Sequence, residues 1–150
     1  MIDRFMAAAL HEAEVGWRHE GGVPIGAVLV DRERIIGRGR NQRVQKEDQL
    51  IHAEIDCLRN TRLTGGYHGM TLYTTLMPCY MCAGTLYQFG IKKVVAGESK
   101  SAPHGREFLD SHGVEVIDLD SVECESLLQE YIHENPEKWA YFLSECNPDG

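Results

Sequence analysis

The chain has 150 residues, 43% of them hydrophobic, a size that suits a single domain spanning residues 1–150. Its 15 basic and 23 acidic side chains give a formal charge of -8, which repels a phosphate backbone and argues against a nucleic-acid polymer as partner. No apolar run reaches membrane-spanning length and the start does not resemble a secretory signal, so we expect a cytoplasmic protein with no membrane partner.

The first third of the chain predicts a helix and then a hairpin. Apolar residues recur at three- and four-residue spacing from Phe5 to Trp17, which is typical of an amphipathic helix, and this helix should end near Gly21. The β-prone runs IGAVLVD and RIIGRGR predict a hairpin with one buried and one more exposed strand. The polar stretch 41–49 should be a loop.

Helical and β-prone patterns alternate after this loop. We expect a helix from Ala53 to Arg59, a strand at TLYTTL, a helix opened by Pro78 that runs to Phe89, and a strand at KKVVAGE. A short helix near 106–111, the strand VEVIDL and the helices SVECESLLQEYIHE and PEKWAYFLSEC should follow. This alternation implies parallel strands with helices on both faces of the sheet, an α/β/α layered domain.

Two short motifs place metal-binding side chains at strand-to-helix junctions. Cys79 and Cys82 stand three residues apart at the start of a predicted helix, so both sulfurs face one side, and the helix N-terminus favours their thiolate forms. His52, just before the other helix, offers a third ligand. Two thiolates and one imidazole predict a Zn²⁺ ion with an open fourth position for water, as in catalytic rather than structural sites.

Glu54 follows His52 by two residues, near enough to face this water without binding the ion. It is the predicted catalytic proton shuttle, which takes a proton from water, delivers it to a ring nitrogen and later protonates a departing amine.

Other interpretations of the cysteines remain open. Cys79 and Cys82 could form a redox dithiol, and Cys57 could complete a closed structural zinc site. At 100° per residue, however, Cys57 lies about 500° around the helix from His52 and should point away from it. We expect all five cysteines to be reduced, with core burial for Cys57, Cys124 and Cys146.

The motif HAE followed by PCYMC matches the H-x-E…P-C-x-x-C pattern of zinc-dependent nucleobase deaminases. The chain resembles the cytidine deaminase superfamily, and within it the fungal-type cytosine deaminases that act on the free base. The similarity runs through GGVPIGAVLV, GRGRNQRVQK, LIHAEIDCLRN, LYTTLMPCYMC, VVAGE and Trp139. It implies a three-layer α/β/α sandwich around a mixed five-stranded sheet, one catalytic Zn²⁺ per subunit, and a homodimer that buries apolar helix faces such as TLYQFGI.

The resemblance also implies a substrate pocket. Asn41 would donate a hydrogen bond to the ring carbonyl of a base, with help from the backbone around Ala53. The side chains implied to wall the flat ring are Ile25, Leu76, Met77 and Trp139. Asn41 could instead bond its own loop backbone and Trp139 could be plain core, while among the other histidines His104 is a candidate for the pocket.

Two positions depart from the fungal-type pattern. These enzymes carry an aspartate where this chain has Phe142, and a phenylalanine near the place of Ala102. An amine that loses this acceptor loses about 1–3 kcal/mol if nothing compensates. Isocytosine carries its amine at C2 and its carbonyl at C4, so it mirrors cytosine about N3. The substitutions favour such a non-cytosine aminopyrimidine slightly; either base would give uracil and ammonia.

Three rival functions share parts of this pattern. Guanine, creatinine or pterin-type amines are alternative small substrates. A tRNA adenosine deaminase shares HAE and PCxMCAG, but the acidic balance argues against tRNA binding. A non-catalytic zinc scaffold would have no need of Glu54.

Overall fold

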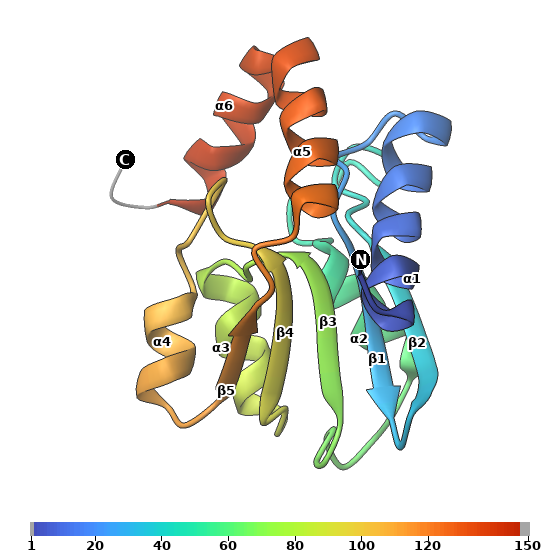
Figure 1. The fold of residues 1–150 in the computed structure, drawn as a ribbon, viewed down its shortest axis with the longest axis vertical. Coiled ribbons are helices and arrows are strands. Elements are labelled where there is room, and N and C mark those ends of the chain that lie inside the picture. The colour runs from blue at the N-terminus through green and yellow to red at the C-terminus, as the bar shows by residue number, and fades with distance from the viewer. Residues whose placement is uncertain (1, 148–150) are drawn as a thin grey trace.

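The computed structural model describes residues 2–147, which form one five-stranded sheet covered by helices on both faces (Figure 1). The strands are β1 (Gly26–Asp31), β2 (Arg34–Arg40), β3 (Thr71–Leu76), β4 (Lys93–Glu98) and β5 (Glu115–Asp118). The helices are α1 (Arg4–Glu14), η1 (Val15–His19), α2 (Ala53–Thr61), α3 (Tyr80–Gln88), α4 (Arg106–Ser111), α5 (Val122–Glu134) and α6 (Pro136–Cys146). In the described residues no helix combines the length and the apolar character needed to cross a bilayer.

The sheet is mixed, with the strand order β2-β1-β3-β4-β5. β1 pairs antiparallel with both β2 and β3, whereas β3, β4 and β5 run parallel to one another. Parallel neighbours need a crossover connection, and α3 and α4 provide it. The predicted three-layer α/β/α sandwich with a mixed five-stranded sheet is therefore confirmed.

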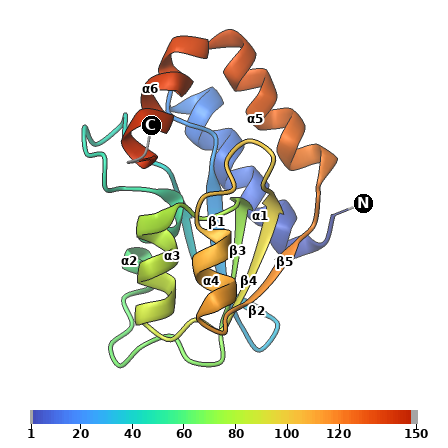
Figure 2. The same ribbon diagram turned by 90° about the vertical axis from the view of Figure 1, so that its left-hand side faces the viewer.

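Alternating side chains of β1 serve two cores. Val28 and Val30 pack in a cluster with residues of α1, whereas Ala27 and Leu29 belong to a larger cluster on the opposite face. Figure 2 shows α2 and α3 on one side of the sheet and α1 and α5 on the other. Because β1 is buried on both faces, its sequence is a nearly continuous run of apolar residues.

Helix α2 lies unusually close to β2. A Cβ atom at Gly39 would lie 2.2 Å from the backbone nitrogen of Cys57, closer than real Cβ contacts come. The lack of a side chain at Gly39 lets α2 rest directly on the strand, and this contact fixes where the first turn of α2 points.

Two helix boundaries differ from the prediction. The first helix is α-helical only to Glu14, and its last turn is π-helical before Gly21 turns the chain with a φ of 75°. Pro78 does not open the third helix: α3 begins at Tyr80, and Cys79 is its N-cap with an extended backbone. Helical dihedrals therefore start only after Cys79.

Helix α6 lies beyond the edge of the sheet at which β3 and β4 end, the edge where open α/β sheets bind ligands (Figure 1). Pro136 occupies its first turn, as predicted, where the missing N–H of proline costs nothing. The chain thus brings its last helix over the junctions that carry the two motifs.

Candidate active site

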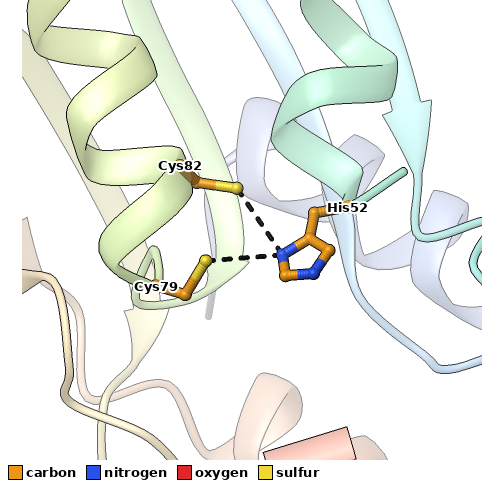
Figure 3. A group of neighbouring side chains, drawn as sticks. All are labelled: His52, Cys79 and Cys82. Atoms are coloured by element: carbon orange, nitrogen blue, oxygen red, sulfur yellow. Dashed lines mark hydrogen bonds between the residues drawn. The ribbon is translucent and has the colours of Figure 1, made fainter. Parts of the chain in front are cut away.

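The two motifs meet at the starts of α2 and α3. His52 is the N-cap of α2, Cys79 is the N-cap of α3, and Cys82 lies in the first turn of α3. The His52 Nδ1 atom is 3.4 Å from the Cys79 Sγ and 3.6 Å from the Cys82 Sγ. Figure 3 shows both sulfurs projecting from one helix toward the same ring nitrogen. All three ligand atoms lie within 4.8 Å of one another.

These separations fit a zinc ion. Zn–S and Zn–N bonds of about 2.3 and 2.05 Å at a tetrahedral angle place sulfur and nitrogen about 3.6 Å apart. Within the described residues the cluster of mutually close ligand atoms contains His52, Cys79 and Cys82, and it does not extend to Cys57. The donor set of one imidazole and two thiolates is that of a catalytic zinc site.

Electrostatics favour ligation by Cys79. Hydrogen bonds from Cys146 and Cys82, together with the neighbouring His52, hold the pKa of the Cys79 thiol far below its usual range. Burial lowers the pKa of His52, but its contact with Cys79 outweighs this and raises it overall. The hydrogen bond to Cys79 and burial raise the pKa of Cys82. Of the two cysteines, Cys79 is therefore the one whose thiolate form these surroundings favour.

Glu54 lies beside the metal ligands in the first turn of α2. Its side chain is 4% exposed and is hydrogen-bonded to Cys82. Burial, and after it the negative charge of Cys79, raise the pKa of Glu54 to about 7. A carboxyl group with this pKa both accepts and returns protons near neutral pH.

A small pocket opens onto this cluster. It is lined by Ile25, Asn41, His52, Glu54, Leu76, Met77, Cys79, Ala102, His104, Phe142, Leu143 and Cys146. It combines a metal site, a titratable carboxyl group and apolar walls.

The sequence profile of the cytidine and deoxycytidylate deaminase zinc-binding region matches residues 1–98, which include both motifs. The chain belongs to this deaminase family. It is a hydrolytic, zinc-dependent deaminase that acts on carbon–nitrogen bonds.

Known relatives of the deaminase differ in substrate. A cytosine deaminase of Candida albicans is 38% identical over 137 residues, which cover 89% of this chain and 91% of the relative. A solved structure from a study of A-to-I editing by tRNA:A34 deaminases is 32% identical with a TM-score of 0.73, and the match covers 83% of this chain and 98% of the other. A guanine deaminase from Nitrosomonas europaea shares the fold at 24% identity, with a TM-score of 0.73 over 85% of this chain and 82% of its own.

Asn41 reaches the deaminase pocket from the end of β2. It is fully buried, and its Oδ1 accepts a hydrogen bond from the backbone N–H of Arg43 at 3.1 Å. This contact orients the amide, because only the oxygen is able to accept from an N–H. The Nδ2 group has no hydrogen-bond partner among the described residues. Asn41 therefore bonds its own loop and also presents a free donor.

The pocket wall on α6 differs from the expected one. Phe142 lines the pocket, with its ring centroid 5.6 Å from that of His52. Trp139 stacks behind Phe142 at 5.2 Å and is not among the lining residues. Ala53 is likewise buried beside the pocket without lining it, whereas His104 does line it and stacks on Tyr80 at 5.8 Å.

Cys146 packs against the edge of the hydrophobic core and is not fully buried as expected. Cys57 and Cys124 are buried as expected, but Cys146 is half-buried and lines the pocket together with Leu143. Of the three α6 residues that line the pocket, Phe142 was expected there, whereas Leu143 and Cys146 were not. Cys146 lies four residues after Phe142 and so shares its side of the helix, but only the docking of α6 reveals that this side faces the metal cluster.

Proposed function

We propose that this deaminase acts on a small free aminopyrimidine, cytosine or its isomer isocytosine, and releases ammonia and uracil. The observation that carries the proposal is the buried Asn41 Nδ2 donor, which has no partner among the described residues and lines the same small pocket as Glu54. A buried donor without a partner is costly, and a ring carbonyl of a bound base would satisfy it.

Glu54 carries out the proton transfers of the proposed reaction. His52, Cys79 and Cys82 would hold the zinc ion, which would supply Lewis acidity and lower the pKa of water to about 7. Glu54 accepts a proton from the attacking water and delivers it to the ring nitrogen beside the amine-bearing carbon. It then protonates the departing amine, and its pKa of about 7 suits both directions of transfer.

The remaining residues orient the base. Asn41 donates to the ring carbonyl, while the apolar side chains of Ile25, Leu76 and Phe142 hold the flat ring and exclude water. Exclusion of water strengthens the electrostatic interactions within the pocket.

The choice between the two isomers rests on Phe142 and Ala102. Phe142 is 4% exposed and offers no acceptor for an exocyclic amine, where the fungal-type pattern has an aspartate. The loss of this acceptor amounts to about 1–3 kcal/mol for cytosine. Isocytosine loses less, because its amine is flanked by the ring nitrogen N1, whose lone pair a carboxylate would repel, whereas the amine of cytosine is flanked by a C–H group. We therefore favour isocytosine slightly.

Initial rates of ammonia release from cytosine and isocytosine test the proposal. We expect activity on at least one of them, with isocytosine equal or preferred. A large preference for cytosine would remove the argument from Phe142. Activity on guanine, creatinine or a pterin, with neither pyrimidine accepted, would overturn the proposed substrate class.

A tRNA adenosine substrate is the second candidate, because a structure from the study of tRNA:A34 deaminases is 32% identical to this chain. The charge of -8 disfavours it, since RNA binding depends on clustered basic side chains. A single deamination assay with tRNA at moderate salt distinguishes the two.

We also propose that the enzyme is a homodimer. Tyr87 and Phe89, at the end of α3 in the segment TLYQFGI, are 40% and 45% exposed. Large apolar side chains that lie together at a surface favour association. Light scattering of the purified protein measures the mass directly, and a monomer at micromolar concentration would contradict the proposal.

A further inference from the structure

Asp56 is a buried carboxylate on α2 that the proposed reaction does not use. It lies two residues after Glu54, and its side chain is 9% exposed. At 100° per residue the two side chains leave the helix about 200° apart, so Glu54 faces the pocket while Asp56 points away from it. A buried carboxylate is costly unless hydrogen bonds satisfy it, and the donors to Asp56 come mainly from the segment that carries Asn41.

The two shortest hydrogen bonds to Asp56 come from the residues on either side of Asn41. The backbone N–H of Arg40, the last residue of β2, donates to Oδ2 of Asp56 at 3.0 Å. The side-chain amide of Gln42 donates to Oδ1 of Asp56 at 3.1 Å. A longer hydrogen bond of 3.4 Å comes from the side chain of Asn60 on the same helix. Asp56 therefore binds the chain immediately before and immediately after Asn41.

Asn41 itself is bound mainly through its main chain. Its N–H donates to the carbonyl of Ile25 at 2.9 Å, and its carbonyl accepts from the side-chain amide of Gln45 at 3.2 Å. Its side chain makes one hydrogen bond, in which Oδ1 accepts from the backbone N–H of Arg43. The direction of the Nδ2 donor thus depends on the path of the segment 40–43, and Asp56 holds two residues of this segment.

Asp56 also ties this segment to the helix that carries Glu54. Helix α2 rests directly on β2 at Gly39, and the carboxylate of Asp56 binds the next residue along the strand. In the proposed reaction Glu54 serves a ring nitrogen and Asn41 the neighbouring ring carbonyl, so the two groups need a fixed separation. A misplacement of about 1 Å in such an arrangement can cost about 100-fold in rate.

We propose that Asp56 is a positioning residue: by binding the residues on both sides of Asn41, it holds the amide donor of Asn41 in register with Glu54. Asp56 is not among the residues that line the pocket, so it acts without touching the substrate. The proposal rests on the proposed function in its use of Asn41 as the carbonyl donor, but not on which base is the substrate.

The side-chain amide of Asn41 provides a test without substrate. In nitrogen–proton correlation spectra of the zinc-loaded protein, its NH₂ signal is identified by its absence from Asn41→Ala. We expect Asp56→Ala to shift or broaden this signal. Asp56→Asn should keep it near the wild-type position, because asparagine still accepts from the N–H of Arg40, and the amide of Gln42 is able to turn and accept from the new NH₂ group.

Two further variants make this test specific. Gln42→Ala removes one of the two contacts and leaves the carboxylate of Asp56 in place, so it should change the Asn41 signal in the same way but less. It carries the same test if Asp56→Ala fails to fold in thermal unfolding. Asp48→Ala is the matched control: its carboxylate accepts a backbone N–H in the same loop, from Leu50 at 2.9 Å, and it should leave the Asn41 signal unchanged.

Steady-state kinetics with cytosine and isocytosine are the second readout. Asn41 addresses a carbonyl that is present in the substrate and in the transition state alike, so its misplacement should raise KM rather than lower kcat. We expect Asp56→Ala to raise KM about 10-fold with kcat within about threefold, and Asp56→Asn to restore most of the loss. Because Asp56 acts through Asn41, the double variant should have the KM of Asn41→Ala alone.

Three outcomes would overturn the proposal. The Asn41 signal could stay at its wild-type position in folded Asp56→Ala and Gln42→Ala proteins, the effects of Asn41→Ala and Asp56→Ala on KM could multiply in the double variant, or kcat alone could fall. Failure to deaminate either pyrimidine, together with the expected changes in the Asn41 signal, would instead refute the proposed substrate and leave the positioning role of Asp56 in place.

Discussion

Replacement of Phe142 by aspartate should shift the substrate preference from isocytosine toward cytosine. Phe142 is 4% exposed and lines the pocket, with its ring centroid 5.6 Å from the ring of His52, and in our proposal it faces the reacting amine. The new carboxylate would lie near the Arg43 guanidinium, which is now 5.8 Å from the Phe142 ring centroid, so a compensating cation is available. Phe142→Asp thereby supplies an acceptor where the wall is now apolar.

The expected change follows from the value of one hydrogen bond. An acceptor restored to the cytosine amine is worth about 1–3 kcal/mol, and each 1.4 kcal/mol is tenfold, so the ratio of kcat/KM for cytosine to that for isocytosine should rise about 5- to 150-fold. The substitution also removes a buried aromatic ring, at a cost in stability of about 3–5 kcal/mol.

The assay is the kcat/KM of each base, with thermal unfolding and zinc content recorded for every variant. Phe142→Leu is the control, because it removes the ring without adding an acceptor and should leave the ratio within about threefold of the wild type. A folded, zinc-loaded Phe142→Asp protein with an unchanged ratio would refute the assignment of Phe142 as a specificity residue.

Further predictions concern the chemistry of the site and the contacts that hold the surrounding helices in place. Glu54→Ala should keep zinc but lose about 10²- to 10⁴-fold in kcat; normal turnover would contradict its role as proton shuttle. Removal of zinc by a chelator should abolish ammonia release and lower the melting temperature, and added zinc should restore both. Glu145→Gln should destabilise the protein by about 0.5–1 kcal/mol in thermal unfolding. Because Arg43 lowers the pKa of Glu145, this stabilisation exists above the ordinary carboxyl pKa and is lost as the pH falls through the lowered value. Gly39→Ala should cost more, about 1–3 kcal/mol, since its Cβ would overlap the backbone of α2.

Arg43 connects α6 to the loop that carries Asn41. It donates its backbone N–H to Asn41 and pairs its side chain with Glu145 on α6. A change at this ion pair should therefore affect both the wall that carries Phe142 and the loop that carries Asn41, the proposed carbonyl donor. This explains why one arginine outside the pocket lining bears on its geometry.

The sequence by itself determined the order of the elements and the three metal ligands. The spacing of apolar residues that predicts a helix or strand is a local property of the sequence. His52 and Cys79 are the N-caps of α2 and α3, so the residues next to them in the sequence fix their positions. The mixed sheet followed once the resemblance supplied the topology. The errors at this level were small, such as the start of α3 two residues after Pro78.

Only the tertiary structure decided which faces meet at the pocket. Local patterns were unable to show that Phe142, rather than Trp139, lines the pocket, or that Cys146 does, because this depends on how α6 docks against His52 at the start of α2. A rotation of α6 about its axis would exchange lining and buried side chains. The Nδ2 group of Asn41, which has no partner among residues 2–147, has the same origin, since its orientation follows from one hydrogen bond within the folded loop.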